Sequence, residues 1–282
     1  MPAFRAFDGT ELAYHVHGAG APLICLPGGP MRASAYLDDL GGLSRHRRLV
    51  LLDLRGTGES AVPADPSSYR CDRLVDDVAA LTDQLGLHTA DVLGHSAGAN
   101  IAVQYALRHQ PRVRKLALIT PSGRAVDLEP DAGMRRQIVK LRQGEPWFAS
   151  AEAAYERVSA RLDAQDDWKA IAPFFYGRWD AAAQAHDAAN EQQVNEIAAA
   201  EFAAAGAFDP AATRAALAGL QAPTLILGGE LDLQRPPLIT AEYAALFPQS
   251  RLVFQPGAGH YPWLDDPASF ASAVNAFLDS DL

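Results

Sequence analysis

The sequence contains few cysteines and no long apolar run. Its 282 residues include only two cysteines, Cys25 and Cys71, which could form at most one disulfide and so exclude a small disulfide-stapled scaffold. No apolar run approaches the roughly 18 residues of a membrane-spanning helix, and the first residues lack the basic-then-apolar pattern of a signal peptide. We therefore expect a cytoplasmic protein that does not bind membranes, with Cys25 as a buried thiol inside an apolar run.

Positive charge is also scarce. The 24 Lys and Arg residues are outnumbered by 34 Asp and Glu residues, which gives a net charge of -10. An acidic surface repels nucleic acid and anionic lipid, and no basic tract offsets it, so we expect no nucleic-acid partner. No Walker A or G-x-G-x-x-G pattern follows a strand-like run, so no nucleotide cofactor is indicated. The acidity either attracts a cationic substrate or serves solubility alone, and the sequence leaves both interpretations open.

The composition is otherwise that of a soluble globular protein, with 49% hydrophobic and 21% charged residues. Short apolar runs bounded by turn residues predict strands buried on both faces. These strands are expected at residues 22–26, 48–54, 90–93 and 115–119, after an alternating strand at 12–17. Helices are expected at 71–85, with Gly86 as its C-cap, and at 97–108. Strands that alternate with helices in this way predict a mostly parallel sheet.

Residues 124–205 interrupt this rhythm. The segment is rich in Ala, Glu, Gln and Arg and shows no strand pattern. The rhythm then returns, with strands expected at 223–227 and 251–254 and helices at 237–247 and 267–278. We therefore expect a core domain made of residues 1–123 and 206–282, into which residues 124–205 insert as a helical lid. The lid tryptophans Trp147, Trp168 and Trp179 either line an apolar substrate pocket or fill the core of the lid.

The most specific motif is the pentapeptide from Gly94 to Gly98, with sequence GHSAG. It follows an expected strand and opens an expected helix, which is the context of the G-x-S-x-G nucleophile elbow. Such an elbow holds its serine, here Ser96, in a strained backbone above the sheet, and its glycines let strand and helix approach closely. The start of the helix also offers N–H groups to a developing oxyanion. Ser96 is therefore the candidate nucleophile.

A serine hydroxyl needs a base, and a base of this kind needs an orienting acid, in the chain order serine, acid, histidine. Only three of the eight histidines follow Ser96, and His260 is the one in a glycine-rich loop after the last expected strand. Two acids follow the strand at 223–227, Glu230 and Asp232. We expect His260 to be the base and Asp232 to orient it, with Glu230 as the alternative acid or a residue that faces the substrate.

The oxyanion hole of such a site needs a second N–H group from the loop after the strand at 22–26. That loop reads Pro27-Gly28-Gly29-Pro30. We expect the N–H groups of Gly29 and Ala97 to bind the oxyanion.

These features together resemble the α/β-hydrolase superfamily over nearly the whole chain. Within it, the first loop, the stretch from Asp53 to Ser60 and the elbow resemble the proline iminopeptidase branch, which typically shows HGGPG followed by D-x-R-G-x-G-x-S. The second pattern matches throughout, whereas in the first Pro27 replaces the histidine and Met31 the final glycine. The resemblance implies an α/β fold with a mostly parallel eight-stranded sheet flanked by helices and a helical lid.

The resemblance also implies an activity, the release of an N-terminal proline or small residue from a short peptide. In such enzymes lid carboxylates hold the free amine of the substrate. Here Trp179 and Asp180 resemble the tryptophan–carboxylate element of that lid, and Glu196 or Glu201 could supply a second carboxylate. The alternative interpretation of each carboxylate is a solvated lid residue.

We therefore predict a serine hydrolase that forms an acyl-enzyme on a small-molecule or short-peptide substrate, without a cofactor or metal. The proline iminopeptidase activity is preferred; an esterase, thioesterase or tailoring hydrolase for a larger acyl substrate is the alternative, and a non-catalytic ligand-binding protein the third. His15 and His17 fall on one face of a strand without a third ligand, which favours an exposed pair at a sheet edge over a metal site. The sequence favours no oligomeric state.

Overall fold

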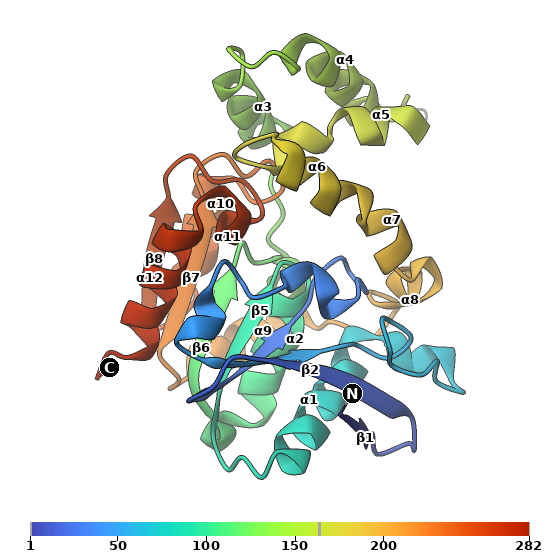
Figure 1. Cartoon of the computed structure of the whole chain (residues 1–282), viewed down its shortest axis with the longest axis vertical. Helices are drawn as coiled ribbons and strands as arrows, with labels where there is room; N and C mark the ends of the chain where they lie inside the picture. The colour runs from blue at the N-terminus through green and yellow to red at the C-terminus, as the bar shows by residue number, and fades with distance from the viewer. Residues whose placement is uncertain (1, 163–164, 282) are drawn as a thin grey trace.

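The computed structural model describes residues 2–162 and 165–281. Figure 1 shows a sheet domain below and a group of helices above it. The eight strands of the described chain form one sheet in the order β1-β2-β4-β3-β5-β6-β7-β8. Only β2 pairs antiparallel to its neighbours, β1 and β4, and the pairs from β4 to β8 are parallel. The predicted mostly parallel eight-stranded sheet is confirmed.

The strands lie where the apolar runs predicted them, with small shifts at their ends. Their bounds are β1 Ala3–Arg5, β2 Glu11–His17, β3 Pro22–Leu26, β4 Arg48–Leu52, β5 Ala90–His95, β6 Val113–Ile119, β7 Thr224–Gly229 and β8 Ser250–Gln255. The short strand β1 has no apolar pattern of its own and was not predicted. It pairs only with residues 11–13 of β2, so His15 and His17 lie beyond it, on the part of β2 that pairs with β4 alone. Their expected position at a sheet edge therefore agrees with the structure, although both side chains are half-buried and not exposed.

The α-helices fill the intervals between strands. Their bounds are α1 Cys71–Gln84, α2 Gly98–Arg108, α3 Ala132–Leu141, α4 Phe148–Ser159, α5 Gln165–Ala170, α6 Ala181–Ala188, α7 Asn190–Gln193, α8 Glu196–Glu201, α9 Pro210–Leu217, α10 Pro237–Ala244, α11 Pro262–Asp265 and α12 Pro267–Leu278. Helix α1 ends one residue before the prediction, and Gly86 just beyond it has a φ of 65°, as a glycine that terminates a helix does.

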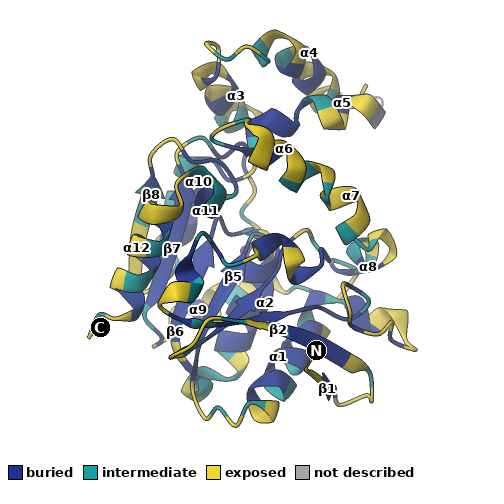
Figure 2. Cartoon of the chain, in the orientation of Figure 1, coloured by how far each residue is buried: buried dark blue, intermediate teal, exposed yellow. Residues whose placement is uncertain are grey.

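Alternate residues of the strands point to opposite faces of the sheet, and each face has its own apolar core. On one face, strand residues such as Ile24 and Val92 pack against α1, α2, α9 and α10. On the other face, Cys25 and Leu93 pack against α11, α12 and the 3-10 helix η1, Ser34–Leu37. Figure 2 shows the central strands buried between these two layers. Because both faces are covered, the central strands consist mostly of apolar residues, and this pattern predicted them.

Between β6 and β7 the described chain contains helices and no strand. Helices α3 and α4 and the 3-10 helix η6, Ala172–Phe175, share a third apolar cluster above the sheet, which includes Phe174 and reaches Leu233 of the sheet domain. Helices α6, α7 and α8 then descend beside the sheet (Figure 1). At the end of this descent Phe202 and Ala198 belong to the core of the sheet domain and not to the cluster above it.

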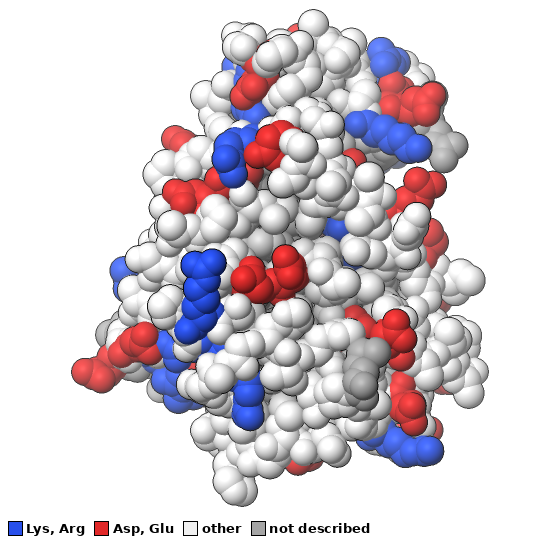
Figure 3. All heavy atoms as spheres, viewed as in Figure 1, with Lys and Arg blue, Asp and Glu red and all other residues white. Residues whose placement is uncertain are grey.

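The two cysteines are free and buried, as predicted for Cys25, so the possible disulfide is not formed. Within the described residues, no helix is long and apolar enough to cross a membrane. On the face drawn in Figure 3, acidic and basic side chains lie in small mixed groups.

Candidate active site

Ser96 lies on a sharp turn between the end of β5 and the start of α2. Its φ is 51°, the left-handed region that residues with a side chain rarely adopt. The turn brings strand and helix so close that a Cβ atom at Gly94 would lie 2.8 Å from the Cα of Ala99. A Cβ at Gly98 would lie 2.4 Å from the carbonyl oxygen of Leu26. The strained serine and the two steric requirements for glycine are those of a nucleophile elbow.

His260 links Ser96 to Asp232. Its Nε2 lies 2.9 Å from the Oγ of Ser96, and its Nδ1 lies 2.8 Å from the Oδ2 of Asp232. With the Nδ1 proton donated to the carboxylate, Nε2 is free to accept the hydroxyl proton of Ser96. His260 and Asp232 are 2% and 0% exposed. The structure thus brings together the three residues predicted from separate loops.

Asp232 is also fixed by its own loop. Its Oδ1 accepts hydrogen bonds from the backbone N–H groups of Gln234, at 2.8 Å, and Arg235, at 3.0 Å. The alternative acid Glu230 lies on the surface, where its Oε2 accepts a hydrogen bond of 2.8 Å from the N–H of Gly257. Of the two acids left open by the sequence, Asp232 therefore contacts the histidine and Glu230 supports the loop that carries it.

The loop after β3 lies against the elbow. A Cβ at Gly28 would be 2.9 Å from the Cβ of Ser96 and 3.3 Å from the backbone nitrogen of Ala97. The N–H of Gly28 donates to the hydroxyl of Tyr36, whereas the N–H groups of Gly29 and Ala97 have no hydrogen-bond partner in the described part of the chain. Gly29, Ser96 and Ala97 line the same cavity. The two predicted oxyanion donors therefore flank Ser96 and are unoccupied by protein acceptors.

The backbone of His260 is held from several sides. Its carbonyl oxygen accepts hydrogen bonds of 3.0 Å from the Oγ1 of Thr120 and from the Nε2 of His95. Burial, followed by the nearby His260, holds the pKa of His95 well below its ordinary value of 6.5, so His95 is neutral. The hydroxyl of Tyr36 donates to its Nδ1 at 2.6 Å, which leaves the proton on Nε2 for the His260 carbonyl. His95 thereby connects the loop of Gly28 to the loop of His260.

The segment between β6 and β7 also reaches His260. The N–H of His260 donates to the carbonyl of Phe175 at 2.7 Å. The carboxylate of Asp265, in α11, accepts hydrogen bonds from the N–H of Gly177 at 2.9 Å and from the N–H of Gly259 at 2.8 Å. The segment that follows η6 is therefore bonded directly to the loop that carries the candidate base.

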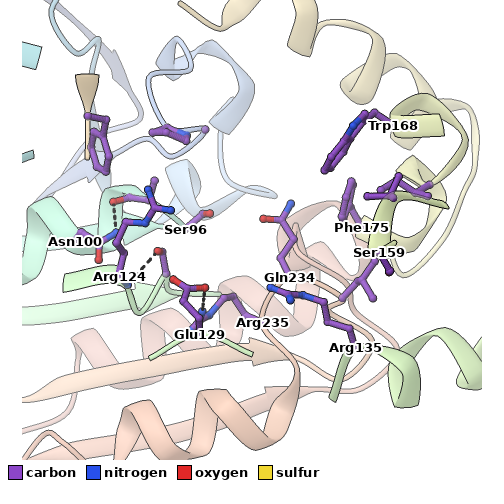
Figure 4. A pocket seen from close by; sticks show the side chains of 18 of the residues that line it. Ser96, Asn100, Arg124, Glu129, Arg135, Ser159, Trp168, Phe175, Gln234 and Arg235 are labelled. Atoms are coloured by element: carbon purple, nitrogen blue, oxygen red, sulfur yellow. Dashed lines mark hydrogen bonds and ion pairs between the residues drawn. The ribbon is translucent and has the colours of Figure 1, made fainter. Parts of the chain in front are cut away.

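A cavity of about 560 Å³ opens on Ser96. Figure 4 shows Ser96, Asn100 and Arg124 at one end, Gln234, Arg235 and Arg135 in the middle, and Trp168 and Phe175 at the other. Apolar side chains from η6, α4 and α8–α9 complete its wall, among them Tyr155, Val158, Ile171 and Phe202. The walls thus come both from the sheet domain and from the segment between β6 and β7.

The lid residues predicted to bind an amine lie outside the lining of this cavity. Asp180 is exposed and caps α6, where it accepts a hydrogen bond of 3.0 Å from the N–H of Ala183. Glu196 is exposed in the first turn of α8, and Glu201 is half-buried at the end of the same helix. Trp179 packs against the ring of Tyr176. Asp180 thus serves as a helix cap and Trp179 packs against a neighbouring ring, and neither lines the cavity.

The sequence left open whether the lid tryptophans line a substrate pocket or fill the core of the lid. The structure shows one tryptophan in each of these positions. Trp168 lines the cavity and is 54% exposed. Trp147 packs edge-on against Phe174, and the guanidinium of Arg142 lies over its ring. Trp147 therefore belongs to the core of the upper helices.

The D-x-R-G-x-G-x-S stretch organises the loop after β4 and does not line the cavity. The carboxylate of Asp53 accepts a hydrogen bond of 2.9 Å from the Nε2 of His15 and bonds of 2.7 Å and 2.8 Å from the hydroxyl and N–H of Ser34. Arg55 is buried and paired with Asp77. His15 is thus occupied by Asp53, and no group of three or more His, Cys, Asp and Glu side chains in the described residues is arranged to hold a metal.

Sequence reasoning missed the arginines of the cavity. Arg124 follows the carboxyl end of β6, and Arg235 comes three residues after Asp232. The rule that ligands bind at the carboxyl ends of parallel strands could have pointed to both. Arg135 lies in α3, and no local pattern distinguishes it from its neighbour Arg136.

Comparisons with known proteins bear on the fold of the chain and on its family. Residues 21–267 match the family model described as alpha/beta hydrolase fold. A proline iminopeptidase from Heyndrickxia coagulans is 27% identical over 99% of this chain and 95% of its own length. A proline iminopeptidase structure from Mycobacterium smegmatis covers 98% of this chain and 97% of its own, with 23% identity and a TM-score of 0.75.

An esterase structure from Exiguobacterium antarcticum covers 99% of both chains, with 21% identity and a TM-score of 0.75. The resemblance to proline iminopeptidases is confirmed, and the similarity extends to proteins named for a different reaction. The matched region contains β3 to α11, hence the elbow and the loops of Asp232 and His260. The chain belongs to the α/β-hydrolase fold family.

Proposed function

We propose that the protein is a serine hydrolase that cleaves a carboxylic ester through an acyl-enzyme on Ser96. The observation that carries this proposal is the continuous hydrogen-bonded series Ser96–His260–Asp232 at the end of a cavity of about 560 Å³. A positioned base converts the weakly nucleophilic hydroxyl into an attacking group, and the buried carboxylate stabilises the imidazolium that results.

The reaction proceeds in two steps. In the first, the Oγ of Ser96 attacks the ester carbonyl while the Nε2 of His260 takes the hydroxyl proton. The carbonyl oxygen becomes an oxyanion that accepts hydrogen bonds from the N–H groups of Gly29 and Ala97. The tetrahedral intermediate collapses, and His260 returns the proton to the departing alcohol. In the second step His260 takes a proton from water, the resulting nucleophile attacks the acyl-enzyme, and the acid is released as Ser96 recovers its proton.

Residues 124–205 act in this scheme as the lid that chooses the substrate. Side chains of α3, α4, α5 and η6 line the cavity, including Arg135, Tyr155 and Trp168. The N–H of His260 donates to the carbonyl of Phe175, so a movement of the lid would also displace the base.

Release of an N-terminal proline is the second candidate, favoured by the 27% identity to a proline iminopeptidase over nearly the full chain. Such a substrate carries a free amine, which needs an unpaired carboxylate near the reacting carbonyl. Glu129 is the carboxylate among the described residues that line the cavity, and Arg235 already pairs with it at 3.3 Å. This argues for ester hydrolysis as the first candidate.

The intact series of Ser96, His260 and Asp232 argues against a non-catalytic binding protein.

The experiment that separates these candidates is a panel of substrates with one chromophore. Aryl esters of several acyl lengths are compared with the arylamides of proline and alanine, for the wild type and for Ser96→Ala. The proposal predicts turnover of the esters that Ser96→Ala abolishes, and little turnover of the arylamides. A preference for the prolyl arylamide would establish the second candidate instead. No turnover of any substrate by the wild type would contradict both.

A further inference from the structure

The cavity in front of Ser96 is positively charged, although the whole chain is strongly acidic. Its lining includes Arg124, Arg135 and Arg235 but only one carboxylate, that of Glu129, among the described residues. The chain as a whole carries a net charge of -10. A concentration of one sign of charge inside a cleft raises the local concentration of ligands of the opposite sign.

Two of the three arginines are not neutralised by protein. Arg235 is 4% exposed, and its guanidinium contacts Glu129 and donates to the carbonyl of Leu128. Arg124 and Arg135 have no carboxylate within ion-pair distance in the described part of the chain, although their neighbour Arg136 is paired with Glu156. Two guanidiniums without a carboxylate partner in the described chain thus line the cavity.

Arg124 is held near the nucleophile by its backbone neighbours. The N–H of Ser122 donates to the carbonyl of Ser96 at 3.0 Å. The N–H of Ala125 donates to the Oδ1 of Asn100, also at 3.0 Å. The short segment that carries Arg124 is therefore fixed to the elbow and to the first turns of α2, and Figure 4 shows Arg124 at the same end of the cavity as Ser96.

Arg235 and Arg135 extend the positive wall away from Ser96. Arg235 is carried by the loop whose N–H groups bind Asp232, and its Nε is buried without a hydrogen-bond partner among the described residues. Burial lowers the pKa of Arg235, Glu129 opposes that effect, and the nearby Arg135 adds to it. The two guanidiniums therefore repel each other across the cavity wall, and an anion between the lid and the sheet domain would relieve this repulsion.

We propose that this cavity selects substrates that carry a carboxylate in addition to the scissile ester, attracted by the unpaired guanidiniums of Arg124 and Arg135 along its wall. The inference rests on the proposed hydrolase function and names its substrate class, a half-ester of a dicarboxylic acid or an ester of similar charge. Guanidinium groups match a carboxylate in geometry, since two parallel N–H groups face its two oxygens. The apolar side chains Tyr155, Val158 and Ile171 line the same cavity and offer a surface for the hydrocarbon part of such a substrate.

The test compares the monomethyl esters of succinic to suberic acid with the same molecules in which the free carboxylate is a primary amide. The two series have nearly the same shape and differ in charge. For at least one chain length, we expect the wild type to prefer the anionic ester about tenfold or more in kcat/KM. Arg124→Gln and Arg135→Gln should each lower this preference ratio by about tenfold, and added salt should lower it in the wild type. The matched control Arg136→Gln should leave the ratio unchanged.

A binding measurement separates failure of this inference from failure of the hydrolase proposal. In Ser96→Ala, calorimetry measures the affinity for adipate and for adipamide, with and without the two arginine substitutions. Turnover that depends on Ser96 but shows no preference for the anionic ester at any length overturns the inference and leaves the hydrolase function standing. Absence of all turnover, together with adipate binding that the arginine variants lose, overturns the hydrolase function and supports an anion-binding cavity. Equal affinity for adipate and adipamide overturns the inference.

Discussion

At the scale of single residues, the site depends on which of two neighbouring acids faces the base. Asp232 is fully buried and contacts His260, whereas Glu230 is exposed and supports the same loop from outside. Asp232→Asn keeps the shape of the side chain but can no longer stabilise the imidazolium or hold the required tautomer. We expect kcat for an aryl ester to fall by about 10³- to 10⁴-fold.

The neighbouring acid provides the control for this measurement. Glu230→Gln should keep kcat within about twofold, because its amide oxygen can still accept the hydrogen bond from Gly257. Comparable losses in both variants would show that the assignment of the acid to Asp232 is wrong.

The order and spacing of the elbow, the acid and the histidine were readable from the sequence because each follows a strand in a parallel sheet. Such loops meet at one edge of the sheet whatever the details of the chain between them. The choice between Asp232 and Glu230 depends on a two-residue difference in a turn, which local patterns do not resolve. The candidate amine-binding residues depended on the path of the lid, and Asp180 instead caps its own helix.

At the scale of elements, the link between the lid and the loop of His260 has a definite chemical form. The carboxylate of Asp265 accepts hydrogen bonds from the backbone of Gly177, Arg178 and Gly259. Asp265→Asn should leave the N–H of Gly259 facing an amide donor, so the loop of His260 shifts. We expect a loss of about 1–3 kcal/mol in the free energy of unfolding and a fall in kcat beyond it, measured at a temperature where the variant is fully folded.

The adjacent acid serves as the matched control. Asp266 caps α12, and its side chain accepts from the N–H of Ser269. Asp266→Ala should cost about 1 kcal/mol in stability while kcat stays at the wild-type value. An unchanged kcat in Asp265→Asn would show that this link stabilises the fold without positioning the base.

The central strands β3 to β7 were predicted well because both faces of the sheet are buried there, so most of their residues form continuous apolar runs. The strand β1 could not be predicted, since a three-residue strand with one buried residue has no periodicity to detect. The contact of His15 could not be predicted either, because its ring donates to the carboxylate of Asp53, which follows a different strand, β4. Helices of the lid were predicted as a group, but their individual bounds depend on caps such as Asn195 for α8.

At the scale of the whole molecule, a buried neutral histidine makes stability depend on pH. Below pH 6.5 the unfolded chain binds a proton at His95, whereas the folded chain does not, because burial holds the pKa of His95 far below 6.5. The free energy of unfolding should therefore fall as the pH drops below about 6.5, by up to about 1.4 kcal/mol per pH unit from this residue.

Urea denaturation between pH 7.5 and pH 5.0 measures this effect. The variant His95→Gln lacks the titrating ring, so its stability should decline less steeply with falling pH than that of the wild type. Parallel declines in the two proteins would mean that His95 is protonated in the folded state.

The central claim is that Ser96 is an activated nucleophile, and covalent labelling tests it most directly. An organophosphonate with a fluoride leaving group reacts with a serine only when a base activates it. Intact mass spectrometry of the folded wild type should show a single adduct that peptide mapping assigns to Ser96, and Ser96→Ala should show none. A folded wild-type protein that acquires no adduct, or acquires it equally in Ser96→Ala, would contradict the account.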